Sequence, residues 1–200
     1  MKRILSGILI GLGILMILGA AGLLLYNRQE SERMASFSAR VLPEISAYLE
    51  EARETATTPP LEPDPLAPPR EMTVAEIDGN FYVGVLSIPA IDYETPVLSE
   101  TSLALLKLGA CRFYGSTYEN DLVLCAHNYE RLFSRLTELR QGDLVWFTDM
   151  DGLTWSYEVA DLETLADYMA EEMINSDYDL TFFTCTYGGQ ARLTLRCVRK

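Results

Sequence analysis

The stretch that decides the fold is TFFTCTYGGQARLTLRC, residues 181–197. Aromatic and β-branched residues on both sides of Gly188-Gly189 are typical of two antiparallel strands joined by a tight turn. If the two glycines form a two-residue turn, the register places Cys185 directly opposite Arg192. The sequence therefore predicts a hairpin that sets a thiol beside a guanidinium.

Side chains alternate between the two faces of a strand, so this register also separates the cysteines of the hairpin. One face is apolar and is the predicted core side; it carries Leu180, Phe182, Leu193, Leu195 and Cys197. We expect Cys185 and Arg192 on the other, polar face, exposed to water. A shift by one residue would bury Arg192 in the core, at a cost that excludes it. Cys197 is thus predicted to be a small core residue, and Cys185 is the unusual cysteine.

The chain contains a single histidine, His127, at the end of the strand-like run LVLCAH. A cation or an imidazolium beside a cysteine favours the thiolate, which is the nucleophilic form. A cysteine and a histidine that are distant in sequence and adjacent in the fold are the pattern of a nucleophile and its acid–base partner. A lone histidine is more often structural, and spacing alone does not show that His127 and Cys185 meet.

Composition limits the other roles of these residues. A zinc site built from Cys125, His127 and two further ligands is conceivable, but the paired Cys-x-x-Cys knuckles that identify such sites are absent. The four cysteines could form disulfides in an exported domain, although their spacing matches no small disulfide scaffold. A formal net charge of −13 argues against nucleic-acid binding.

The N-terminus predicts a membrane anchor. Residues 4–26 contain no charge and would extend roughly 34 Å as a helix, enough to cross a bilayer core. Lys2 and Arg3 precede this span, whereas the charges after it nearly cancel, which favours a cytoplasmic tip at residues 1–3 and an exported remainder. A cleaved signal peptide is the alternative, but its apolar region would be shorter, about 7–15 residues.

Between the anchor and the domain, residues 27–58 read as a helical stalk, or as a helix lying against the domain. Pro43 should interrupt it, giving one broken helix or two short ones. Residues 59–72 form a linker with six of the nine prolines of the chain, which we expect to be extended and to set the distance from the bilayer to the domain. The globular domain then covers residues 73–200.

Within this domain the signals are mostly those of strands. Short runs of aromatic and β-branched residues, bounded by Gly and Pro, predict strands at 81–89, 93–98, 111–115, 121–128, 143–148 and 153–165. Asp149-Met150-Asp151-Gly152 reads as a hairpin turn rather than part of a calcium loop, and short helices are expected at 130–139 and 166–174. No long helices alternate with the strands, so we expect an antiparallel or mixed β-barrel.

The set Ala126-His127-Asn128, then Thr181-Phe182-Phe183-Thr184-Cys185, then Arg192 resembles the sortase family, the membrane-anchored cysteine transpeptidases of Gram-positive bacteria. The family pattern around the cysteine is Thr-Leu-x-Thr-Cys, so Phe182 replaces a leucine on the core face. Ala126 also stands where the family usually has glycine before its histidine. The resemblance covers residues 81–199 and implies a closed eight-stranded sortase-type β-barrel; it leaves the subclass open and suggests a class B-like or class D-like member.

The resemblance further implies catalytic roles for His127, Cys185 and Arg192, with no metal or organic cofactor. The substrate would be an LPXTG-like or NPXTN-like sorting signal of an exported protein. The acceptor would be an amine of a peptidoglycan precursor or a pilin lysine. Two alternatives stay open, a hydrolytic thiol peptidase and a non-catalytic, membrane-tethered binding domain.

Overall fold

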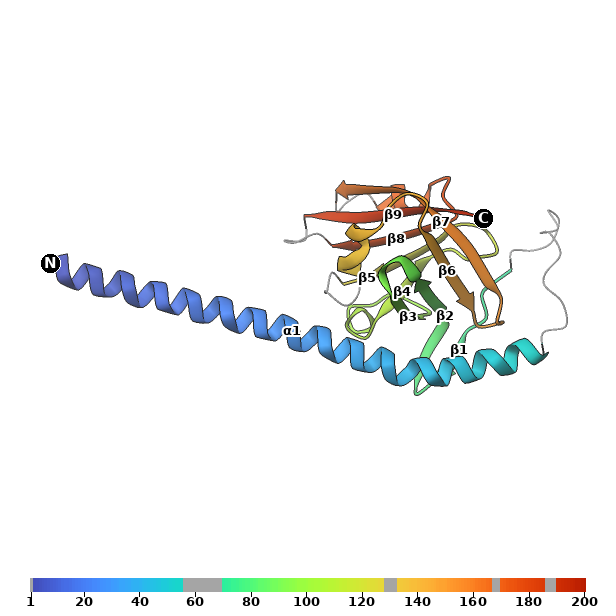
Figure 1. The fold of residues 1–200 in the computed structure, drawn as a ribbon, viewed down its shortest axis with the longest axis horizontal. Helices are drawn as coiled ribbons and strands as arrows, with labels where there is room; N and C mark the ends of the chain where they lie inside the picture. Colours follow the sequence, from blue (N-terminus) through green and yellow to red (C-terminus); the bar gives the residue numbers. More distant parts are fainter. Residues whose placement is uncertain (1, 56–69, 128–132, 167–169, 186–189) are drawn as a thin grey trace.

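The computed structural model describes residues 2–55, 70–127, 133–166, 170–185 and 190–200 (Figure 1). It is a long helix followed by a mostly β domain with short helical segments. The elements in chain order are α1 (Lys2–Thr55), β1 (Ala75–Ile77), β2 (Asn80–Ile88), η1 (Pro89–Ile91), β3 (Tyr93–Leu98), η2 (Leu105–Lys107), β4 (Ala110–Tyr114), β5 (Leu122–Ala126), η3 (Phe133–Glu138), β6 (Leu144–Asp149), β7 (Thr154–Ala166), α2 (Ala170–Ile174), β8 (Leu180–Cys185) and β9 (Ala191–Arg199).

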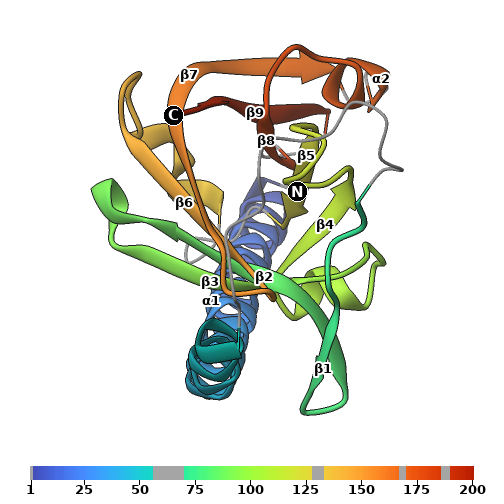
Figure 2. The same cartoon turned by 90° about the vertical axis from the view of Figure 1, so that its right-hand side faces the viewer.

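The sheet has the strand order β1-β2-β3-β4-β5-β8-β9-β7-β6, and β6 pairs back onto β2. This last pairing closes β2 to β9 into an eight-stranded barrel, visible as a ring in Figure 2, with β1 attached outside the closure. The pairs β3–β4 and β5–β8 are parallel and the other pairs are antiparallel. The predicted closed mixed barrel is thereby confirmed. The three-residue strand β1 was not predicted.

The register of the β8–β9 hairpin is the one the sequence predicts. Cys185 pairs with Arg192 and Thr181 with Arg196. The predicted Gly188-Gly189 turn lies outside the described residues. Short helices also occur in both predicted places, α2 at Ala170–Ile174 and η3, a 3₁₀-helix, at Phe133–Glu138.

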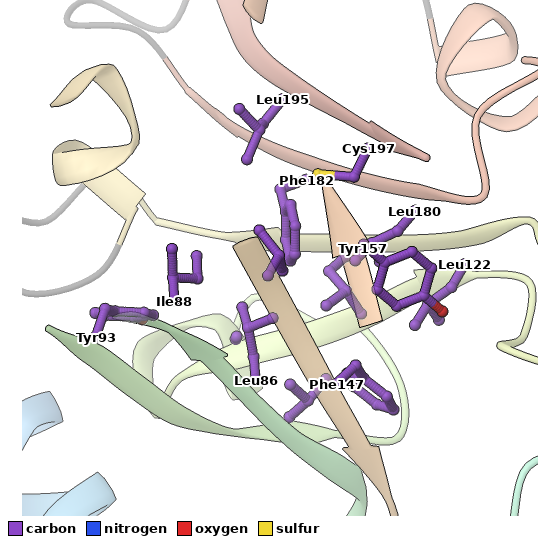
Figure 3. Packing of buried hydrophobic residues seen from close by; sticks show 14 of the residues in the cluster. Leu86, Ile88, Tyr93, Leu122, Phe147, Tyr157, Leu180, Phe182, Leu195 and Cys197 are labelled. Carbon is purple, nitrogen blue, oxygen red and sulfur yellow. The ribbon is translucent and has the colours of Figure 1, made fainter. Parts of the chain in front are cut away.

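The barrel interior is filled by the apolar face of each strand. Figure 3 shows Phe182, Leu195 and Cys197 pointing inward together with side chains of β2, β5, β6 and β7. All three are fully buried. The prediction that Cys197 is a core residue is confirmed, and its burial raises the pKa of the thiol.

A second apolar cluster lies outside the barrel wall, between the sheet and α1. It joins Val41, Ile45 and Leu49 of the helix to Tyr82, Val85, Leu98, Cys111, Cys125 and Met150 of the domain. The buried positions of α1 recur every three or four residues, which gives the helix one apolar stripe; they are Ser31, Met34, Ser38, Val41, Ile45 and Leu49. This packing makes residues 30–53 a part of the domain rather than a stalk that stands away from it.

The predicted break at Pro43 is wrong, because α1 runs without interruption through it. Pro43 and Ala39, whose carbonyl loses its helical partner, both lie on the exposed side of the helix. Water can therefore hydrate that carbonyl, and the apolar stripe on the opposite side holds the helix together. Figure 1 shows α1 curving around the barrel in this half, as expected for a proline on the convex side.

The expectation that the outer face of the hairpin is exposed to water holds only in part. Arg196 lies on that face but is 3% exposed. Its guanidinium donates to Glu163 Oε1 of β7 at 2.7 Å, to Thr181 Oγ1 at 3.1 Å and to the carbonyl of Glu172 in α2 at 2.9 Å. These bonds compensate the burial of the charge and fix α2 over β8 and β9. The sequence pattern alone does not predict this burial, because charged side chains are mostly exposed.

The β6–β7 turn binds the chain on both sides of the proline-rich linker, at the end of α1 and directly after the linker. Arg53, near the end of α1, donates to the carbonyl of Gly152 at 3.3 Å. Gly152 has φ +80, and a Cβ there would meet Arg53 Cγ at 2.7 Å, so glycine is required. Beyond the linker, Arg70 and Thr73 both donate to Asp151 of the same turn, at 2.8 and 2.7 Å. The predicted turn is thus confirmed, with a structural function.

Candidate active site

The three residues singled out in the sequence lie on or directly after three adjacent strands. Cys185 ends β8, Arg192 belongs to β9, and His127 follows the last residue of β5. In the parallel pair β5–β8, Ala126 is the partner of Thr184. Continuing this register by one residue sets His127 beside Cys185, at the usual strand spacing of about 4.8 Å. On the other side, Cys185 pairs with Arg192. The backbone therefore arranges histidine, cysteine and arginine in one row across the barrel wall.

His127 follows the last residue of β5 and is half-buried. The pKa of its imidazole is lowered, mainly because burial disfavours the charged form and also because the Lys107 ammonium is nearby. Lys107 ends η2, which leads into the neighbouring strand β4. The imidazole is therefore mainly neutral at pH 7. No sequence pattern pointed to Lys107, because its approach to His127 depends on the β4–β5 pairing.

Cys185 is the last residue of β8 and is described by its backbone. The thiols of Cys111, Cys125 and Cys197 are all buried, and burial raises the pKa values of Cys111 and Cys197. Such thiols are poor nucleophiles at neutral pH. Cys185 thus differs from the other three cysteines by its position at the end of β8, beside Arg192.

Arg192 stands near the start of β9 on the outer face and is partly exposed. Its Nη1 donates to the carbonyl of Ala191 at 3.1 Å. A guanidinium carries further donors in a planar fork, which suits a carbonyl oxygen or an oxyanion. In this position it can act on a group that is bound to the neighbouring cysteine.

The outer face next to the row is apolar rather than polar. One step further along the strands, Cys125 of β5 pairs with Phe183 of β8. The Phe183 ring makes an edge-to-face contact with Phe113 of β4, with ring centroids 5.1 Å apart. Phe113 is itself partly exposed. An aliphatic side chain bound here would be in contact with aromatic rings. The alternation of β8 predicts Phe183 on this face, but no sequence pattern pointed to Phe113.

Among the described residues, no group of three or more His, Cys, Asp or Glu side chains is placed to hold a metal ion. Cys125 contacts Thr101 Oγ1 at 3.2 Å instead.

The depressed pKa of His127 gives a first testable prediction. Because the chain has one histidine, its NMR titration is unambiguous. The midpoint should lie below 6.5, the usual value. Lys107→Gln should raise the midpoint, since the repulsive ammonium is removed, without fully restoring 6.5, since burial remains. Lys200→Gln is the matched control, because Lys200 pairs with Glu158 and should leave the midpoint unchanged. A wild-type midpoint at or above 6.5 would contradict this description of the site.

Comparison with known proteins adds an independent finding. A family model described as a sortase domain matches residues 86–200. The structure of sortase C1 from Streptococcus agalactiae is 30% identical, covering 62% of this chain and 70% of that chain with a TM-score of 0.53. Sortase C from Streptococcus pneumoniae is 25% identical, covering 84% and 96% with a TM-score of 0.55.

A third solved structure is similar to this chain in its fold. The sortase D5 transpeptidase from Clostridium perfringens covers 82% of this chain and 99% of that chain, with a TM-score of 0.60. At 17% identity it shows a shared fold alone. None of the curated proteins compared with the chain matches it.

Proposed function

Because this chain belongs to the sortase family, we propose that it is a cysteine transpeptidase with Cys185 as nucleophile, His127 as acid–base residue and Arg192 as stabiliser of the substrate. The observation that carries the proposal is the row of these residues across β5, β8 and β9. A nucleophile, a proton carrier and a donor fork on adjacent strands are what acyl transfer requires.

The first half-reaction forms a thioester. The Cys185 thiolate attacks the carbonyl carbon of the substrate's threonine, and the carbonyl oxygen becomes an oxyanion. Arg192 donates hydrogen bonds to this oxyanion or to the adjacent substrate backbone. The imidazolium of His127 then gives its proton to the amide nitrogen as the C–N bond breaks, so the downstream segment leaves as an amine.

The second half-reaction regenerates the Cys185 thiolate and the imidazolium of His127. An incoming amine attacks the thioester carbonyl and loses a proton to the neutral imidazole of His127. The C–S bond breaks, the Cys185 thiolate leaves, and a new amide joins the substrate to the acceptor. The lowered pKa of His127 favours the neutral imidazole, which is the form that accepts a proton in this step, over the imidazolium form that the first step uses.

For the substrate we propose a sorting signal of the LPXTG or NPXTN kind. The apolar strip formed by Phe113 and Phe183 supports this, since it suits the aliphatic first residue of an LPXTG signal. The acceptor is an amine of a peptidoglycan precursor or a pilin lysine. The solved relatives include class C and class D sortases, and the class B or D resemblance of this chain stays a prediction.

For the location we propose a single-pass anchor with the catalytic domain outside the cell. Part of α1 is long and apolar enough to cross a membrane, and the rest of the described chain leaves that part uncovered. The positive residues Lys2 and Arg3 support a cytoplasmic N-terminus.

Product analysis tests the function. The protein should be incubated with LPXTG and NPXTN peptides, with and without an oligoglycine or diaminopimelate amine, and the products read by mass. A transpeptidase yields the amide-joined product when the amine is present. Release of the free carboxylate alone in both conditions would favour a hydrolytic thiol peptidase. Unchanged peptide in every condition would favour a binding domain.

A further inference from the structure

The two ends of the barrel differ in their relation to α1. The row of His127, Cys185 and Arg192 lies at one end, together with Ala166 at the end of β7, which pairs with Ala191. The opposite end carries the C-terminus of β9, where Arg199 pairs with Tyr157 near the start of β7. We call the first of these the catalytic end.

The direction of α1 along the barrel follows from its contacts. Arg53, near the end of α1, bonds to Gly152 in the turn that precedes β7, and this turn lies toward the opposite end. The contacts of α1 begin at Ser31, 22 residues earlier in the helix, or about 33 Å away. The helix therefore enters at the catalytic end. Figure 1 agrees: the ends of β7 and β8 point back toward the N-terminal half of α1.

The distance from the apolar span to the barrel is short. The uncharged run ends at Tyr26 and the first buried helix residue is Ser31, so five residues, about 7.5 Å of helix, separate them. The headgroup layer on each side of a bilayer is about 5–8 Å thick. If residues 4–26 span the membrane, the catalytic end meets the headgroups of the outer leaflet.

The proline-rich linker cannot set this height. Its two sides are fixed to one turn of the domain, by Arg53 on Gly152 and by Arg70 on Asp151. A longer or shorter linker leaves both fixed points where they are. The span and the barrel are instead connected by one continuous helix, whose length is fixed at about 1.5 Å per residue.

We propose that α1 is a rigid spacer that holds the catalytic end against the outer surface of the membrane. This proposal rests on the proposed function for its substrate. A peptide held far above the bilayer would not reach the row, whereas a soluble peptide could diffuse to it. Holding enzyme and substrate in one plane raises their effective concentration.

Two insertions of the same length distinguish the effect of the helix length from the effect of the linker length. Seven helix-forming residues between Asn27 and Arg28 add about 10.5 Å and nearly preserve the phase of the helix. The matched control places the same seven residues between Asp64 and Pro65. The full-length proteins are reconstituted in vesicles that contain a peptide substrate attached close to a membrane segment, and a soluble version of the peptide is assayed in parallel.

The helix insertion should lower turnover of the membrane-held substrate at least tenfold and leave soluble-peptide turnover within twofold. The linker insertion should change neither rate. Normal turnover of the held substrate by the helix-insertion variant, or loss of it in the linker variant, would overturn the proposal. If even the unaltered protein fails on the soluble peptide, the proposed function is at fault instead.

A second measurement does not depend on catalysis and reports the distance between the barrel and the membrane surface directly. Energy transfer from Trp146 and Trp155 to dansyl-labelled lipid headgroups should fall in the helix-insertion variant and stay unchanged in the linker variant. Equal transfer in all three proteins would contradict a rigid helical spacer, whatever the rates show.

Discussion

Replacing Cys185 by alanine should abolish formation of the amide-joined product, with a loss of at least about 10⁴-fold. The attacking atom is removed, and no other described cysteine can replace it. Cys111 and Cys125 are buried in the cluster beneath α1, and Cys197 points into the barrel core. The measurement is turnover of a sorting peptide with an added amine, followed by mass.

The matched control is Cys197→Ala. It removes a fully buried sulfur and should lower the free energy of unfolding by about 1 kcal/mol while leaving turnover nearly unchanged. Cys185→Ala should show the reverse, with an unchanged melting temperature and no product. Persistent turnover by Cys185→Ala would show that the nucleophile is misassigned.

Replacing His127 by glutamine should lower turnover by about 10²–10⁴-fold. Glutamine keeps a polar side chain of similar reach but cannot exchange a proton, so both the departing and the incoming amine lose their partner. His127 is only half-buried at a strand end, so stability should change little. The loss should be checked by steady-state rates across pH, where the limb that reports the imidazole should disappear.

Chemical rescue distinguishes proton transfer from a structural role of His127. Free imidazole added to the glutamine variant should restore part of the rate, and it should have no effect on Cys185→Ala. A His127→Gln enzyme with near-normal turnover would mean that another group carries the proton. Loss of activity together with a lower melting temperature and no rescue would mean that His127 is structural.

The hairpin shows how much of the site follows from sequence. The apolar alternation of β8 and β9 leaves one register that keeps Arg192 out of the core, and that register is observed. The position of His127 did not follow in the same way. It depends on the parallel pairing of β5 with β8, two strands that are more than 50 residues apart in the chain, and no local pattern specifies such a pairing.

The differences between expectation and structure have a common physical origin in tertiary packing. Pro43 breaks an isolated helix, but here the barrel holds α1 through its apolar stripe. Arg196 is charged and was expected in water, yet α2 and Glu163 cover it. The charge of Lys107 lowers the pKa of His127 only because the pairing of β4 with β5 brings the two residues near each other. Each depends on a contact between segments that are distant in sequence.

The most direct test is the identity of the covalent intermediate. The protein is mixed with a sorting peptide in the absence of an acceptor amine, quenched in acid within the first turnovers, and digested for peptide mapping. A thioester that adds the peptide fragment ending in threonine to Cys185, and to no other residue, is the expected result. An adduct on Cys111, Cys125 or Cys197, or product formed without any adduct, would contradict catalysis by the row that β5, β8 and β9 bring together.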